Sequence, residues 1–183
     1  MKKILFAAVI IAGTFAVSNS AKAQTTTTAS TNVKITLTDF ITAHDGNGTT
    51  AGDTPGAGAE VAFAYPTAAS YTVDQTIAKT GHLKVTATKS FGVKVKASGA
   101  NFTNGVNEIP VDVMDIIATA PGSGTATTKT LSAADQEILT GVNSGIKSID
   151  VSYTIPFARA QANILGKASG AYSQTVIYTF SQP

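Results

Sequence analysis

The sequence predicts an all-β protein, an antiparallel β-sandwich of about eight strands with at most one or two short helical turns. Apolar and polar residues alternate over many short segments, as in strands that have one buried and one exposed face. Turn-forming residues separate these segments at the spacing typical of a sandwich. No long segment with a helical period lies between them, which argues against the crossover helices of a parallel sheet.

Residues 1–23 have the features of a secretory signal peptide. Lys2 and Lys3 are basic, residues 4–17 are apolar or small, and Ala21-Lys22-Ala23 matches a cleavage site. We therefore predict export to the periplasm, the cell surface or the extracellular space. No second apolar run reaches membrane length, so the mature chain is predicted to lack a transmembrane segment.

The remaining chain is long enough for one domain with a substantial hydrophobic core. We predict a flexible Thr-rich leader over residues 24–32 and a single β-sandwich domain over residues 33–183. The chain contains no cysteine, which excludes disulfides, thiol chemistry and a cysteine-linked lipid anchor. Three of the 13 basic residues lie in the signal, which leaves ten against 11 acidic residues and gives no reason to predict a nucleic-acid partner.

The first part of the domain is predicted to contain three short strands and one long loop. The loop covers residues 42–58, which are rich in glycine. The apolar residues of the strands are Val33, Ile35 and Leu37, then Val61, Phe63 and Tyr65, and then Tyr71, Val73 and Ile77.

Residues 82–98 are predicted to form a β-hairpin. Alternating apolar residues over 83–87 and 91–97 would form its core face, and Lys89-Ser90 would form its turn. Asn104-Gly105 predicts a further turn. A strand over residues 109–113 follows, and Pro110 within it favours an edge or a bulge.

The next part of the chain contains one ambiguous stretch. Residues 118–130 are rich in Thr, Gly and Ala and predict a loop. Over residues 131–140, the Ser132 and Asp135 spacing fits a short capped helix, whereas the apolar residues also fit a strand. Residues 149–157 give the most regular alternation in the chain, and residues 158–165 predict two turns of helix.

Residues 170–183 predict the closing strand of the sheet. Tyr172, Val176, Tyr178 and Phe180 alternate with polar residues, so we predict that these four side chains belong to the core. The stretch G-A-Y-S-Q-T-V-I-Y-T-F-S-Q-P resembles the closing motif of secreted bacterial β-sandwich surface proteins. The closest resemblance is to WxL cell-surface domains, with Tyr178-Thr179-Phe180 in the place of Trp-x-Leu.

Residues 82–115 and the last two strands also resemble secreted immunoglobulin-like bacterial surface and pilus proteins. The two resemblances imply an immunoglobulin-like sandwich at the bacterial surface. The resemblance to WxL domains further implies non-covalent attachment to cell-wall peptidoglycan.

Catalytic motifs are sparse in this sequence. His44 and His82 are its only histidines, and neither lies in a nucleophile motif such as G-x-S-x-G. Any two of the 11 acidic residues could meet in space as the carboxylate pair of a glycosidase. We predict a non-enzymatic protein without cofactors and keep a glycoside-cleaving enzyme as a third alternative.

Two groups of residues are candidates for binding. Asp45, Asn47 and Asp53 offer oxygen ligands for calcium, although the loop lacks the closing Glu of an EF-hand and equally fits an Asx-turn. Lys84, Lys94 and Lys96 would share the outer face of the predicted hairpin and face a polyanion. Alternatively, Glu108 and Asp112 on the next strand would pair with these lysines.

These observations predict an exported cell-surface module with a structural or adhesive role, associated with the cell wall. Its partners would be a cell-wall polymer or neighbouring surface-protein subunits. The alternative is a pilus or fibre subunit that assembles by β-strand donation, because the leader and the alternating residues 33–37 supply a mobile segment with apolar anchors.

Overall fold

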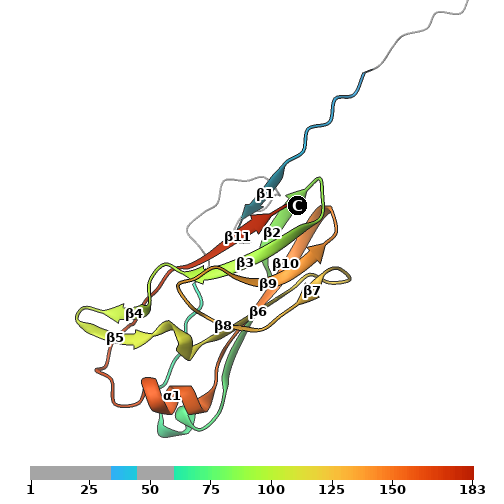
Figure 1. Ribbon diagram of the computed structural model, residues 1–183. Helices are drawn as coiled ribbons and strands as arrows, with labels where there is room; N and C mark the ends of the chain where they lie inside the picture. The colour runs from blue at the N-terminus through green and yellow to red at the C-terminus, as the bar shows by residue number, and fades with distance from the viewer. Residues whose placement is uncertain (1–33, 45–59) are drawn as a thin grey trace, which may run out of the picture. The chain divides into compact units, whose positions relative to one another are not determined.

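The computed structural model describes residues 34–44 and 60–183, and it confirms an all-β fold with antiparallel pairing (Figure 1). The described residues form eleven strands, one α-helix and two 3-10 helices. Residues Leu37–Pro183 make one compact unit that contains all of these elements. Of the preceding unit, residues 34–36 are described, and they belong to no strand.

The larger sheet has five strands in the order β1-β2-β10-β6-β8. Its two long central strands, β2 and β10, pair along their whole length, and each has a buried face of alternating apolar residues. The bounds of the five strands are β1 Ile41–His44, β2 Gln75–Ala87, β10 Gly145–Ile155, β6 Asp115–Thr119 and β8 Lys129–Thr130.

The second sheet has four strands in the order β11-β3-β9-β7, and a separate pair is formed by β4 and β5. Gly105 makes the β4–β5 turn with φ +61°, a conformation that favours glycine, as the Asn104-Gly105 signal predicts. The bounds are β11 Val176–Ser181, β3 Phe91–Ala97, β9 Gln136–Val142, β7 Thr125–Ala126, β4 Asn101–Asn104 and β5 Asn107–Pro110.

The inward residues of the two larger sheets form one hydrophobic core. Its largest fully buried side chains come from both sheets and from the connection that follows β8, and they include Phe91, Ile116, Leu131, Ile138, Leu139 and Ile149. Helix α1 (Phe157–Asn163) is fastened to this unit by Arg159, whose guanidinium group lies 2.6 Å from the Asp115 carboxylate on β6. The short helix predicted over residues 158–165 overlaps α1. Phe157, which is predicted to end the preceding strand, is instead the first residue of this helix.

The predicted hairpin over residues 82–98 is wrong. Its two arms are β2 and β3, which belong to different sheets, so the connection between them crosses from one sheet to the other. The inward residues of both strands are buried in the common core. Alternation alone does not distinguish the two arrangements, because apolar faces can be covered side by side in one sheet or face to face between two sheets.

Several other segments differ from the prediction. Val61, Phe63 and Tyr65 pack against the core without forming a strand, and Tyr71 ends a 3-10 helix, η1 (Ala68–Tyr71). Val111 and Val113 are buried but lie in a second 3-10 helix, η2 (Val111–Val113). The predicted loop over 118–130 contains β7, β8 and the end of β6. Of the ambiguous stretch 131–140, residues from Gln136 onward form β9, and residues 131–135 belong to neither a strand nor a helix.

Candidate functional site

Residues 34–38 belong to no strand, so the predicted first strand is wrong over these residues. The side chain of Ile35 is 79% exposed and that of Leu37 is 90% exposed. Strand pairing begins only at Ile41, opposite Ala87 of β2. The structure therefore presents a segment with alternating apolar side chains that no described strand covers; Val33, the first residue of the pattern, lies outside the described residues.

Polar contacts at the surface hold the point at which this segment joins the compact unit. The Asp39 carboxylate lies 2.6 Å from the Lys89 ammonium group. The backbone N–H of Phe40 donates to the Thr88 hydroxyl oxygen, and the Phe40 carbonyl accepts from the backbone N–H of Thr88. That carbonyl also accepts from the Gln182 side chain at 3.1 Å. Residues 39 and 40 are thus fixed between the β2–β3 connection and the end of β11.

The closing strand β11 forms one edge of the four-stranded sheet. It pairs with β3 in an unbroken register from Val176 to Ser181, and no described strand pairs with its other side. Val176, Tyr178 and Phe180 pack against the core but are only half-buried. Tyr172 precedes the strand, also packs half-buried against the core, and donates its hydroxyl hydrogen bond to the Ala168 carbonyl.

A buried polar cluster connects β11 to the five-stranded sheet. The Tyr153 hydroxyl group on β10 lies 2.8 Å from His82 Nε2 on β2 and 2.6 Å from the Tyr178 hydroxyl group on β11. The His82 ring stands edge-on to both tyrosine rings. The sequence suggests only that His82 opens a strand; it does not reveal the cluster, because its three members come together across two sheets.

A bulge in β2 explains how His82 reaches this position. The register with β10 shifts between Ile149 and Val151, so that residues 80–82 lie opposite Asp150. Gly81 occupies the bulge with φ +61°, and its N–H donates to the Asp150 carboxylate at 2.7 Å. The extra residues turn the His82 side chain inward beside Leu83, where both are buried.

The environment of the cluster changes the acidity of its phenols. Burial raises the pKa of Tyr153 to about 12, while the hydrogen bond from Tyr178 opposes the increase. Burial, together with Tyr153, raises the pKa of Tyr178 well above its ordinary value. Both phenols are therefore neutral throughout the physiological range of pH, and the cluster is a structural connection between the sheets.

We expect the protein to lose stability as the pH rises from 10 to 12. In this window the unfolded chain releases the Tyr153 proton near pH 10, whereas the folded chain retains it to about pH 12. The unfolded state then binds fewer protons, so the free energy of unfolding falls by about 1.4 kcal/mol per pH unit for this group. Urea unfolding at pH 8 to 12 measures the loss. Tyr153→Phe should make the profile less steep, although Tyr65 and Tyr178, whose pKa values burial also raises, still contribute to it. Ser152→Ala, on the outward face of β10, should leave the slope unchanged; equal slopes in the two variants would contradict the assignment.

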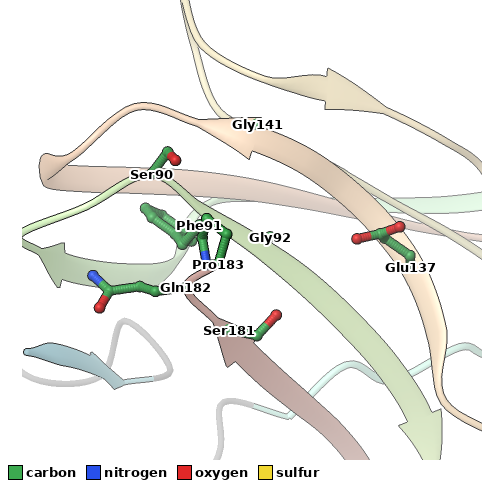
Figure 2. A pocket seen from close by; sticks show the side chains of 8 residues that line it. All are labelled: Ser90, Phe91, Gly92, Glu137, Gly141, Ser181, Gln182 and Pro183. Carbon is green, nitrogen blue, oxygen red and sulfur yellow. The ribbon is translucent and has the colours of Figure 1, made fainter.

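A shallow hollow of about 260 Å³ lies on the four-stranded sheet at the end of β11 (Figure 2). Glu137 on β9 and Ser181 on β11 flank Gly92 on β3. A Cβ atom at Gly92 would lie 3.2 Å from the Glu137 carboxylate oxygen, so the missing side chain helps to create the hollow. Glu137 is the one acidic side chain among the residues that line the hollow, whereas glycoside cleavage uses two carboxylates.

The predicted calcium ligands Asp45, Asn47 and Asp53 all lie outside the described residues. Within residues 34–44 and 60–183, no group of three or more His, Cys, Asp or Glu side chains is placed to hold a metal ion. His44 is the last residue of β1 and stands opposite Lys84 of β2.

The structure separates the three lysines of the predicted polyanion patch. Lys84 is on β2 in the five-stranded sheet, while Lys94 and Lys96 are on β3 in the other sheet. Lys96 forms an ion pair with Asp135 at 3.4 Å. Of the two acidic residues predicted to pair with these lysines, Glu108 accepts a hydrogen bond from Asn101, and Asp112 lies in η2.

A scan against models of protein families finds no match, and a search of the curated proteins finds no significant relative. The resemblance to WxL domains and to immunoglobulin-like surface proteins therefore stays a prediction. In the described part of the chain, every helix is too short or too polar to cross a membrane.

Proposed function

We propose that this protein is an exported, non-enzymatic structural subunit of the bacterial cell surface, folded as an immunoglobulin-like β-sandwich. Copies would join by strand donation, with residues 34–38 of one copy completing a sheet of the next. The observation that carries the proposal is the exposure of Ile35 and Leu37 in a segment that belongs to no described strand. This observation favours the fibre subunit over a self-sufficient wall-bound module, in which these side chains would be covered by their own domain.

The exposed apolar area of Ile35 and Leu37 favours binding to a partner. A large side chain that moves from water into a protein interior contributes about 1.5–3 kcal/mol. Ile35 and Leu37 therefore have a strong tendency to bind an apolar groove, and their alternation with Lys34, Thr36 and Thr38 suits a strand with one face inward. Each donated strand would add backbone hydrogen bonds to this gain.

The anchoring of residues 39 and 40 supports the same function. The ion pair from Asp39 to Lys89 and the hydrogen bonds of Phe40 fix the base of the segment to the rest of the unit. A fixed base limits the conformational freedom of the segment, and this lowers the entropy that is lost when it binds to a neighbour. A fixed base would also transmit tension from the donated strand to the donor's core, as a fibre requires.

Size-exclusion chromatography of the mature protein, with and without residues 24–37, tests this function. We expect the full mature chain to form polymers that resist dissociation, and the deletion variant to be a folded monomer. A synthetic peptide of residues 33–38 should raise the melting temperature of that monomer, and a peptide with the same residues in scrambled order should not. A full-length protein that stays monomeric at all concentrations would overturn the proposal in favour of the self-sufficient surface module.

A further inference from the structure

We infer that the acceptor for a second copy is the open edge of β11, where residues 34–38 of that copy would extend the four-stranded sheet. The inference rests on the proposed function and names the surface at which assembly occurs. Within the described residues, the edges of the two larger sheets differ in how well they could accept an added strand.

Three of the four strands at the ends of the two larger sheets are short. β1 has four residues, and β7 and β8 have two residues each. Short edges offer few unpaired backbone groups, which is one of the ways in which proteins prevent edge-to-edge association. β11 has six residues and is the longest terminal strand of the two sheets.

Another edge without a partner among the described strands lies on β2, because β1 pairs only with its residues 84–87. The rest of this edge, residues 75–83, carries two features that oppose strand addition. One is the bulge at residues 80–82. The other is Lys79, which stands opposite the buried Val151 and therefore lies on the core-facing side of the sheet. An inward charge on an edge is costly for an added strand to cover.

β11 has none of these protections. Its residues, V-I-Y-T-F-S, include no charge and no proline, and its register with β3 has no bulge. On its inner side, Val176, Tyr178 and Phe180 are only half-buried, so an added strand could cover more of them. On its outer side, Ile177 is 37% exposed. β1 comes near β11, as Figure 1 shows, but it pairs with β2 and makes no ladder with β11.

The segment 34–38 of a second copy fits this edge. Five extended residues span about 16 Å, comparable to β11 itself. A register that turns Ile35 and Leu37 toward the half-buried row of β11 leaves Thr36 outward, beside the exposed Ile177 and Thr179. The donor is a second copy and not the same chain, since Leu37, which belongs to the same unit as β11, is 90% exposed and Gln182 holds Phe40 beside the end of that strand.

Disulfide cross-linking tests the acceptor, and the cysteine-free chain provides a clean background. The test variants of the mature protein carry Thr36→Cys with either Ile177→Cys or Thr179→Cys, because all three positions are exposed and two partners allow for two registers. Under mild oxidation, we expect at least one pair to give a ladder of covalent multimers on denaturing gels. The matched control pairs Thr36→Cys with Ala78→Cys, an exposed position on the uncovered edge of β2, and should give none.

The other outcomes separate the possible errors. Multimers from the Ala78 pair and none from the β11 pairs would overturn the acceptor assignment while strand donation stands. A disulfide within a single chain, seen as a faster-migrating monomer, would mean that β11 binds its own segment, and would also overturn the assignment. If the unmodified mature protein forms no polymers, the proposed function fails first and the acceptor with it. The single variant Thr36→Cys is the control for chance contact. It has one cysteine per copy, so oxidation can link it only into dimers and not into a ladder.

Discussion

Replacing Phe91 with Ala is expected to lower the free energy of unfolding by about 3–5 kcal/mol. Phe91 is 1% exposed, lies at the start of β3, and its ring centroid is 6.5 Å from that of Phe180 on β11. Its removal would leave a cavity where the β2–β3 connection enters the core, and the surrounding strands cannot easily collapse into it. The loss would be a large part of the 5–15 kcal/mol that stabilises a typical domain.

Urea unfolding at neutral pH measures this loss, and Phe157→Ala is the matched control. Phe157 is 45% exposed at the first turn of α1, so its truncation removes the same side chain from a wetter site. We expect the control to cost much less than Phe91→Ala. Equal losses in the two variants would mean that Phe91 does not occupy a tightly packed core position.

Alternation in the sequence predicts those strands that have an apolar inward residue at every second position without a break. In β10, residues Val151, Tyr153 and Ile155 are all buried and the residues between them are not, so the period-2 pattern is directly visible. In β11 the inward residues are half-buried and the residues between them are exposed, so the same period is visible. A short helix is predicted after β10 because the alternation stops at Pro156 and a run of helix-forming residues follows.

Alternation does not reveal how strands are partnered. β2 and β3 each have one buried face, and this is equally true of a hairpin and of two strands that face each other across the core. The pattern of residues 33–37 is likewise the same for a paired strand and for an unpaired segment with exposed Ile35 and Leu37. Partner choice depends on contacts between residues far apart in sequence, and a single sequence does not encode these in a local period.

The polar cluster was beyond sequence reasoning for the same reason. His82, Tyr153 and Tyr178 are far apart in sequence, and each fits a local pattern without the others. The one local signal is Gly81, which interrupts the alternation of β2 and marks a bulge. A glycine inside a strand pattern next to a histidine predicts an irregularity there, but it does not predict which side chains the histidine meets.

Replacing Tyr178 with Ala is expected to cost about 3 kcal/mol of unfolding free energy. Two contributions add up in this variant. The first is the loss of the Tyr178 ring, which packs against the core and stands edge-on to the His82 ring. The hydroxyl group of Tyr153 also loses the partner that lies at 2.6 Å, inside a region where unpaired polar groups are costly. Because Tyr178 is on β11 and its two partners are on β10 and β2, the substitution weakens a connection between the sheets.

Two further variants separate these contributions. Tyr178→Phe keeps the ring and removes the hydroxyl group, so its expected cost is about 1 kcal/mol, the usual net value of one hydrogen bond. Thr179→Ala changes the exposed neighbour on the other face of β11 and should cost less than about 0.5 kcal/mol. The urea concentration at the midpoint of unfolding should therefore be highest for Thr179→Ala, lower for Tyr178→Phe and lowest for Tyr178→Ala. If Thr179→Ala were the most damaging, the faces of β11 would be reversed, and Tyr178 would lie on the outer side of the edge to which a second copy is proposed to bind.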